Sequence, residues 1–249
     1  MSYIELGDCL EKMNKIPDGS VDMILCDLPY GITSCKWDEV IPFDELWEQY
    51  KRIIKDNGAI LLFGTEPFAS KCRMSNQKMY KYDWIWKKTV ASNFVNCNRQ
   101  PLKKHEVISV FYFKQPTYNP QMREGKPYID KRNGQCRNNI TVNDEQQMHR
   151  KPINNTGTRY PSTVLSYSNG NNNRLHPTQK PVALLEYLIK TYTNEGETVL
   201  DNCMGSGSTC VAAINTNREY IGIELDETYF NIAKERIERA LLDKEGATA

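Results

Sequence analysis

The sequence predicts an α/β fold, a doubly wound parallel sheet that is interrupted by an irregular insertion. Apolar runs of strand length alternate with amphipathic, helix-like stretches near both ends of the chain. Between them, residues 115–174 are rich in Asn, Gly, Pro, Lys and Arg and have few periodic apolar residues. We therefore expect a core of residues 1–114 and 175–249, with residues 115–174 inserted into it.

The first third alternates strands and helices. "VDMILCD" (21–27) is continuously apolar, which is typical of a strand covered on both faces. "FDELWEQYKRIIK" (43–55) has a helical apolar face, and "DNG" (56–58) predicts its stop before a second buried strand, "AILLFG" (59–64). Two further strands are expected over 82–88 and 106–114.

Regular patterning returns after His176. "PVALLEYLIKTYT" (181–193) predicts an amphipathic helix with proline near its first turn. The remaining stretches predict, in order, a strand (198–203), a glycine turn leading into a helix (205–217), a strand (219–225) and a helix (227–242).

Composition indicates an ordinary globular chain. Its 249 residues are 39% hydrophobic and 25% charged, and no apolar run approaches the roughly 18 residues of a membrane span. The start of the chain lacks a signal-peptide pattern, so we expect a cytoplasmic protein with reduced thiols and no membrane association. Eight cysteines without a CxxC pair, and only three histidines, give no support for a metal site.

Charge is distributed unevenly. Residues 84–174 contain 15 Lys and Arg against 5 Asp and Glu, whereas the rest of the chain contains 17 against 26. A basic middle in an acidic frame is typical of a polyanion-binding segment. The alternative is a solvated loop region with a chance basic bias.

A cofactor loop is predicted where a strand meets a helix, at "DNCMGSGST" (201–209). Gly205 and Gly207 permit a tight turn and close approach of a ligand, and Glu224, which ends the next strand, is placed to hold ribose hydroxyls. Cys210 replaces the third glycine of the dinucleotide fingerprint, and no GK[ST] is present. A nucleoside with a cationic group that meets Asp201 fits better, as in S-adenosylmethionine. A purely structural turn is the alternative.

With these residues the sequence resembles the DNA amino-methyltransferases, which methylate an exocyclic amine of adenine or cytosine. "DLPY" (27–30) resembles their DPPY tetrapeptide, and it precedes the cofactor loop as in their permuted group. "HPTQKPVALLEYLI" (176–189) is similar to the segment that closes over the cofactor, and "LGDC" (6–9) to the turn that meets its adenine. The resemblance implies a Rossmann-like S-adenosylmethionine-dependent fold whose insertion recognises the DNA target.

The resemblance also implies a mechanism. Asp27 and the main-chain carbonyl of Leu28 would hold the amine, Pro29 would shape the turn, and Tyr30 would stack on a base flipped out of the duplex. Leu28 departs from the family's proline but still offers a carbonyl. The resemblance implies a second aromatic contact to the flipped base, and the candidates for it are Trp37, Phe94 and Tyr112.

Further contacts follow from the same resemblance. It assigns Asp8 and Cys9 to the cofactor, and Lys180 to the cofactor carboxylate, although a lysine at that place is by itself more typical of a solvated helix start. His176 and Thr178 would only shape the loop that contains them.

The basic middle of the chain supplies candidate phosphate or base contacts, and "SNFVN" (92–96), which contains Asn93, resembles family residues near the target base. The candidate DNA contacts are Lys87, Lys88, Asn93, Arg99, Lys103, Arg123, Arg132 and Arg159.

Four functions remain open. Asp27 favours the adenine N6 amine, because enzymes acting on the cytosine N4 amine more often begin the tetrapeptide with Ser. Methylation of RNA or of a protein amide is a third reading, and an inactive DNA-binding homologue is a fourth. Double-stranded DNA is the expected partner; the resemblance leaves a homodimer and a cognate restriction endonuclease open.

Overall fold

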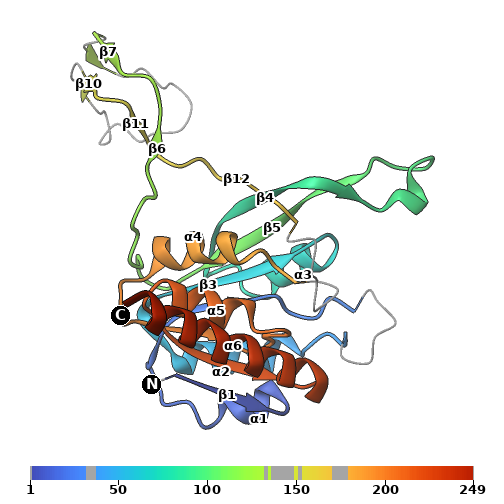
Figure 1. Cartoon of the computed structure of the whole chain (residues 1–249). Coiled ribbons are helices and arrows are strands. Elements are labelled where there is room, and N and C mark those ends of the chain that lie inside the picture. Colours follow the sequence, from blue (N-terminus) through green and yellow to red (C-terminus); the bar gives the residue numbers. More distant parts are fainter. Residues whose placement is uncertain are drawn as a thin grey trace. The chain divides into compact units, whose positions relative to one another are not determined.

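The computed structural model describes residues 2–31, 38–131, 134–135, 149–150, 153–169 and 179–248. The chain forms two compact units, one of residues 1–119 with 163–249 and one of residues 120–162 (Figure 1). Among the described residues, no helix has the length and apolar character needed to cross a membrane.

The first unit contains an eight-stranded sheet in the order β1-β14-β13-β2-β3-β5-β4-β12. Its strands are β1 (Tyr3–Leu6), β2 (Val21–Cys26), β3 (Ile54–Gly64), β4 (Tyr80–Ser92), β5 (Lys103–Phe111), β12 (Val164–Tyr167), β13 (Thr198–Asp201) and β14 (Glu219–Glu224). The prediction of an α/β fold is confirmed, with one correction to the sheet. Strand β5 runs antiparallel to both β3 and β4, because a hairpin joins it directly to β4.

Helices cover both faces of this sheet. They are α1 (Cys9–Met13), α2 (Phe43–Ile53), α3 (Phe68–Ser75), α4 (Val182–Tyr192), α5 (Ser208–Asn215) and α6 (Glu227–Thr248). One apolar core contains side chains of α4, α5 and α6, and a second contains side chains of α1, α2 and α3. This division into two cores is the doubly wound arrangement that the alternating pattern predicts.

The hydrophobic pattern missed several boundaries. The "DNG" stop is wrong, because residues 56–58 lie inside β3, which pairs with β2 from Ile54 onward and has an irregular register. The short elements β1, α1, α3 and β12 were not predicted, because each carries too few apolar residues to show a period.

The second unit contains short antiparallel strand pairs. They are β6 (Arg123–Glu124) with β11 (Thr158–Arg159), β7 (Tyr128–Asp130) with β10 (Ile153–Asn155), and β8 (Gly134–Gln135) with β9 (His149–Arg150). The chain leaves the first unit at Asn119, whose main-chain N–H donates to the Thr191 carbonyl at 2.8 Å. It returns at β12, which pairs in parallel with β4.

Candidate active site

A cavity of about 620 Å³ lies at the carboxyl ends of β2, β13 and β14, which are neighbours in the sheet or separated by one strand. Asp27 follows β2, Asp201 ends β13 and Glu224 ends β14, and all three residues line this cavity. Open α/β sheets bind their ligands at this edge. The tetrapeptide and the glycine loop, far apart in the sequence, therefore face one space.

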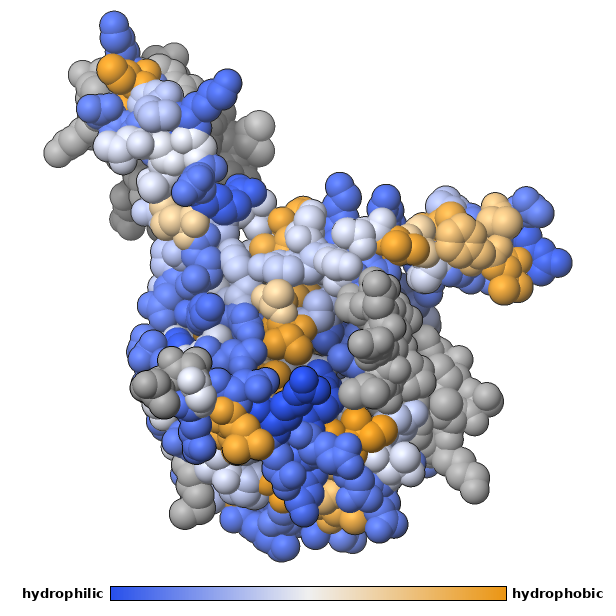
Figure 2. Space-filling model, in the orientation of Figure 1, coloured by the Kyte–Doolittle hydropathy of each residue, from blue (hydrophilic) through white to orange (hydrophobic). Residues whose placement is uncertain are grey.

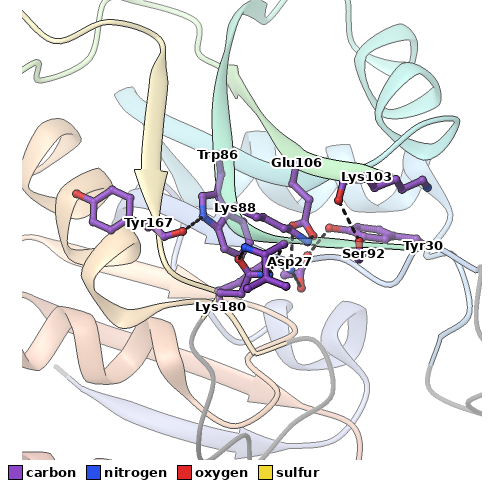
Figure 3. Close-up of polar contacts among 11 residues, drawn as sticks. Asp27, Tyr30, Trp86, Lys88, Ser92, Lys103, Glu106, Tyr167 and Lys180 are labelled. Carbon is purple, nitrogen blue, oxygen red and sulfur yellow. Dashed lines mark hydrogen bonds and ion pairs between the residues drawn. The ribbon is translucent and has the colours of Figure 1, made fainter. Parts of the chain in front are cut away.

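The Asp27 carboxylate is held by two side chains (Figure 3). The Tyr30 hydroxyl donates to Oδ1 at 2.5 Å, and the Lys180 ammonium donates to Oδ2. Burial raises the pKa of Asp27, while the Lys180 charge opposes this shift. The contact with Lys180 thus favours the ionised carboxylate, the form that can accept hydrogen bonds.

A second carboxylate extends this contact into a four-charge cluster. Glu106 on β5 forms ion pairs with Lys88 of β4 and, at 3.5 Å, with Lys180. Burial acts to raise the pKa of Glu106, but the two ammonium groups outweigh it and lower that pKa. The pKa of Lys180 is raised, because Asp27 and Glu106 outweigh its burial. We refer to Asp27, Lys88, Glu106 and Lys180 as the charge cluster; two charges of each sign balance it.

The Tyr30 side chain is fixed by packing and by its backbone. Its ring lies against Phe68 with centroids 4.8 Å apart, and its main-chain N–H donates to Asp38 at 2.7 Å. Burial, with the nearby Asp27 charge, raises the pKa of Tyr30 well above its usual value, so the hydroxyl stays a donor. Tyr30 lines the cavity.

Leu28 has a structural role that the sequence did not reveal. Its side chain is 3% exposed and belongs to the core cluster that contains Met13 and Leu46. The buried Leu28 side chain anchors the turn of residues 27–30 to the core. Leu28 and Pro29 also border the cavity.

The glycine loop is held by carboxylates and by α6. Glu224 is 8% exposed and accepts N–H hydrogen bonds from Gly205 at 2.7 Å and Asp226 at 2.8 Å. Burial raises the pKa of Glu224. The Arg236 guanidinium donates to the Ser206 carbonyl and, at 3.1 Å, to the Ser208 hydroxyl. The loop is therefore ordered by the protein's own groups.

Asp201 is the most deeply buried carboxylate of the loop, at 4% exposed. Burial raises its pKa to about 6, although hydrogen bonds from Thr209 and the Cys203 N–H favour the charged form. A carboxylate with this pKa gains from a cationic partner, because the cation offsets the cost of its burial.

The remaining cofactor candidates differ in position. Asp8 caps α1 by accepting the N–H groups of Leu10 and Glu11, and it lines the cavity with Cys9. Gly207 adopts a left-handed φ of 75° and packs against Ala233 of α6. Unlike Gly205, it is not among the residues that border the cavity.

Lys180 lines the cavity, and its assignment to the cofactor carboxylate stays a prediction. Its side chain is 8% exposed, and its ammonium contacts Asp27 and Glu106 rather than marking a solvated helix start. Glu106, Lys88 and Arg236 were not assigned to the catalytic or cofactor site from sequence. A charged residue heading the buried strand "HEVISVFYF" was the available signal for Glu106, because buried glutamates are rare unless they are paired.

The DNA candidates fall into two groups. The first group belongs to the β4–β5 hairpin and its turn and consists of Lys87, Lys88, Asn93, Arg99 and Lys103; of these, Lys88 and Lys103 border the cavity. Arg123 and Arg159 lie in the second unit. The Arg159 guanidinium stacks on Tyr128, 4.5 Å from the ring centroid, and donates to Asn155 and Lys126, which is an arrangement that orders the unit itself. Trp37, Arg132, His176 and Thr178 lie outside the described residues.

Comparisons with known proteins identify the family of this chain. Residues 21–235 match the N6_N4_Mtase family, described as DNA methylase. The type II methyltransferase M.HpaI of Haemophilus parainfluenzae is 28% identical, over 93% of this chain and 73% of its own. The putative methylase YubD of Escherichia coli is 29% identical, over 95% of this chain and 90% of its own.

Solved structures show the same fold. The cytosine-N4-specific PvuII DNA methyltransferase superposes with a TM-score of 0.68 at 16% identity, over 97% of this chain and 90% of that one. The complex of M1.HpyAVI with SAM superposes with a TM-score of 0.64 at 23% sequence identity. The match covers 95% of this chain and 99% of that one. Because the family match spans most of the sequence, including the tetrapeptide and the glycine loop, the chain belongs to the N6/N4 family of DNA methylases.

Proposed function

We propose that this protein transfers a methyl group from S-adenosylmethionine to the exocyclic N6 amine of adenine in double-stranded DNA. The observation that carries the proposal is that Asp27, Asp201 and Glu224 all line one cavity. Family membership supports methyl transfer to DNA. The choice of adenine depends on Asp27 at the first position of the tetrapeptide.

The cavity has groups that suit this cofactor. Asp201 offers a buried carboxylate for a cationic group, and Glu224 lies where a ribose would be held. Asp8 and Cys9 would border the adenine. When bound, S-adenosylmethionine supplies an electrophilic methyl group on a sulfonium. The structural neighbour M1.HpyAVI has been solved with SAM, which supports the assignment by likeness of fold.

Asp27 and Leu28 would hold the target amine. An exocyclic amine is a poor nucleophile, because its lone pair is delocalised into the ring. One N–H donating to the Asp27 carboxylate and the other to the Leu28 carbonyl would favour a pyramidal nitrogen, whose lone pair is no longer conjugated with the ring and can attack the methyl group. The ionised carboxylate would also stabilise positive charge developing on nitrogen. Lys180 would keep Asp27 ionised without touching the base.

A base within a duplex cannot reach this cavity, so the target must be flipped out. Tyr30 would present its ring to the flipped base, and stacking of this kind contributes about 1–3 kcal/mol. Residues 115–174 would carry most of the target recognition. A homodimer and a cognate restriction endonuclease are further proposals that rest on the family alone.

The test is methyl incorporation from labelled S-adenosylmethionine into DNA and RNA, followed by nucleoside analysis. We expect label in DNA only, as N6-methyladenine, and we expect Asp27→Ala to lose at least about a hundredfold in rate because it removes the amine acceptor. Label found only as N4-methylcytosine would replace the adenine assignment with its nearest rival. Equal activity of Asp27→Ala would exclude this centre. Mapping the modified positions would give the recognition sequence.

A further inference from the structure

The β4–β5 hairpin extends away from the rest of the first unit as an arm (Figure 1). We define the arm as residues 87–105, the ends of both strands and the turn between them. Its two strand ends border the active-site cavity, because Ser92, Lys103 and His105 line it. Whatever the free end contacts is therefore connected by a short, hydrogen-bonded ribbon to the place where a target base would lie.

The arm carries apolar side chains that pack against little of the protein, Val90 on β4 and two more in the turn. Phe94 is 61% exposed, Val95 97% and Val90 56%. Figure 2 shows apolar surface gathered along the arm toward its free end. Exposed phenylalanine and valine side chains do not gain the free energy that burial of apolar surface provides. We therefore expect a partner to cover them.

The end of the arm is an ordered turn. Asn93 adopts a left-handed φ of 71°, and residues 94–96 form the 3-10 turn η1. The Asn96 side-chain amide donates to Asn93 Oδ1 at 2.8 Å, and the N–H groups of Arg99 and Gln100 both donate to the Asn96 carbonyl. These bonds order the turn that carries Phe94 and Val95.

The charge of the arm identifies the class of partner. Residues 87–105 contain five Lys and Arg and no Asp or Glu. The side chains of Lys87, Arg99, Lys103 and Lys104 are exposed. A second copy of this arm would present the same positive charge and be repelled, whereas a polyanion would be attracted along its whole length.

We propose that Phe94 and Val95 form an apolar wedge that enters the DNA base stack beside the target base, while the basic side chains of the arm contact phosphates. The proposal rests on the function proposed above and adds a residue-level site to it. Proteins that distort a duplex commonly insert Phe, Leu or Ile between base steps. Here the wedge stabilises the gap that the flipped base leaves and so lowers the cost of flipping.

The test compares two duplexes that contain the mapped recognition sequence. One is fully paired, and the other has an abasic position opposite the target base, so that its flipping no longer breaks a pair. We expect the double variant Phe94→Ala/Val95→Ala to lose at least about tenfold in kcat/KM on the paired duplex and less than about threefold on the other. Phe94→Leu keeps an apolar wedge and retains most of the rate on both.

Leu242→Ala is the matched control, because Leu242 on α6 is 67% exposed and lies outside the arm. It leaves both rates unchanged. Equal losses of the double variant on the two duplexes, no loss on either, or a change in its oligomeric state in sedimentation would each overturn the wedge.

Binding separates failure of the wedge from failure of the proposed function. If the wild-type protein transfers no methyl group to any DNA, the proposed function is contradicted. The wedge can still be tested in that case, because fluorescence anisotropy measures binding to duplexes of any sequence. Wild type binds a duplex with one internal abasic site more tightly than the intact duplex, since unstacking there is easier. The double variant loses most of this preference; if it keeps the preference in full, the wedge is wrong.

Discussion

At the scale of single residues, the Asp27 carboxylate already accepts a hydrogen bond on each oxygen before any substrate is considered. An incoming amine must use a remaining lone pair or replace Tyr30 or Lys180. Lys180 has a second carboxylate within reach in Glu106, so its charge stays paired as the amine binds. The charge cluster therefore lets Asp27 change partners without leaving a buried ammonium unpaired.

Glu106→Gln tests this balance. The substitution leaves Lys88 and Lys180 with one carboxylate between them in a buried place, and we expect a loss of about 3 kcal/mol in the free energy of unfolding, measured with urea. The double variant Lys88→Met/Glu106→Gln restores equal numbers of charges and recovers part of this loss. Strictly additive effects in this cycle would show that the two side chains are not coupled.

The raised pKa of Asp201 gives cofactor binding a pH dependence. Below about pH 6 the carboxyl group in the free protein is protonated and offers no charge to a cation. Affinity for S-adenosylmethionine should therefore fall as the pH drops from 7 to 5, by up to about tenfold per unit below the pKa. Calorimetry of wild type and Asp201→Asn checks this. The variant should bind S-adenosylmethionine weakly at every pH, and its affinity should keep only the pH dependence that Glu224 contributes. If the affinity of the variant changes with pH as steeply as that of the wild type, Asp201 does not bind the cationic group.

At the scale of elements, the start of α5 depends on one glycine. Gly207 precedes this helix with φ of 75°, and a Cβ there would lie 3.0 Å from the Cβ of Ala233. Gly207→Ala combines an unfavourable backbone conformation with a close contact, so we expect it to cost roughly 1–2 kcal/mol of stability and to weaken cofactor binding. Thermal unfolding and cofactor titration measure both effects. Gly246→Ala on α6, where no atom lies within 4 Å of the added Cβ, is the control and should not destabilise.

The long apolar elements of this fold could be predicted from the sequence. Continuous apolar runs predicted β2, β13 and β14, and a strand end followed by an acid or a glycine loop pointed to Asp27, Asp201 and Glu224. Pairing between distant strands could not be read in this way. The antiparallel β5, the edge strand β12 and the contact of Lys180 with Asp27 all depend on neighbours brought together only by the whole sheet.

At the scale of the whole molecule, positive charge is concentrated in the arm and the insertion, within an otherwise acidic chain. DNA affinity should consequently fall steeply with salt. We expect Arg99→Gln/Lys104→Gln to reduce the slope of log K against log salt concentration by up to about 2, with similar weakening on all sequences, as phosphate contacts do. Titrations at several salt concentrations measure this. Lys234→Gln on α6 removes one exposed charge outside the arm and should leave the slope unchanged. If it reduces the slope as much as the arm variant does, the arm attracts DNA through the overall charge of the protein and not through phosphate contacts.

Asn119 and β12 give the second unit two fixed points of attachment. At the first, the Asn119 side chain also donates to the carbonyls of Lys190 and Thr193 at the end of α4; at the second, Leu165 of β12 pairs with Trp86 of β4. Both attachments are made by residues of the first unit. Under the proposed function, residues 120–162 are thus a segment that evolution or an engineer can exchange between fixed ends, so that a new sequence specificity can arise while the chemistry is inherited unchanged.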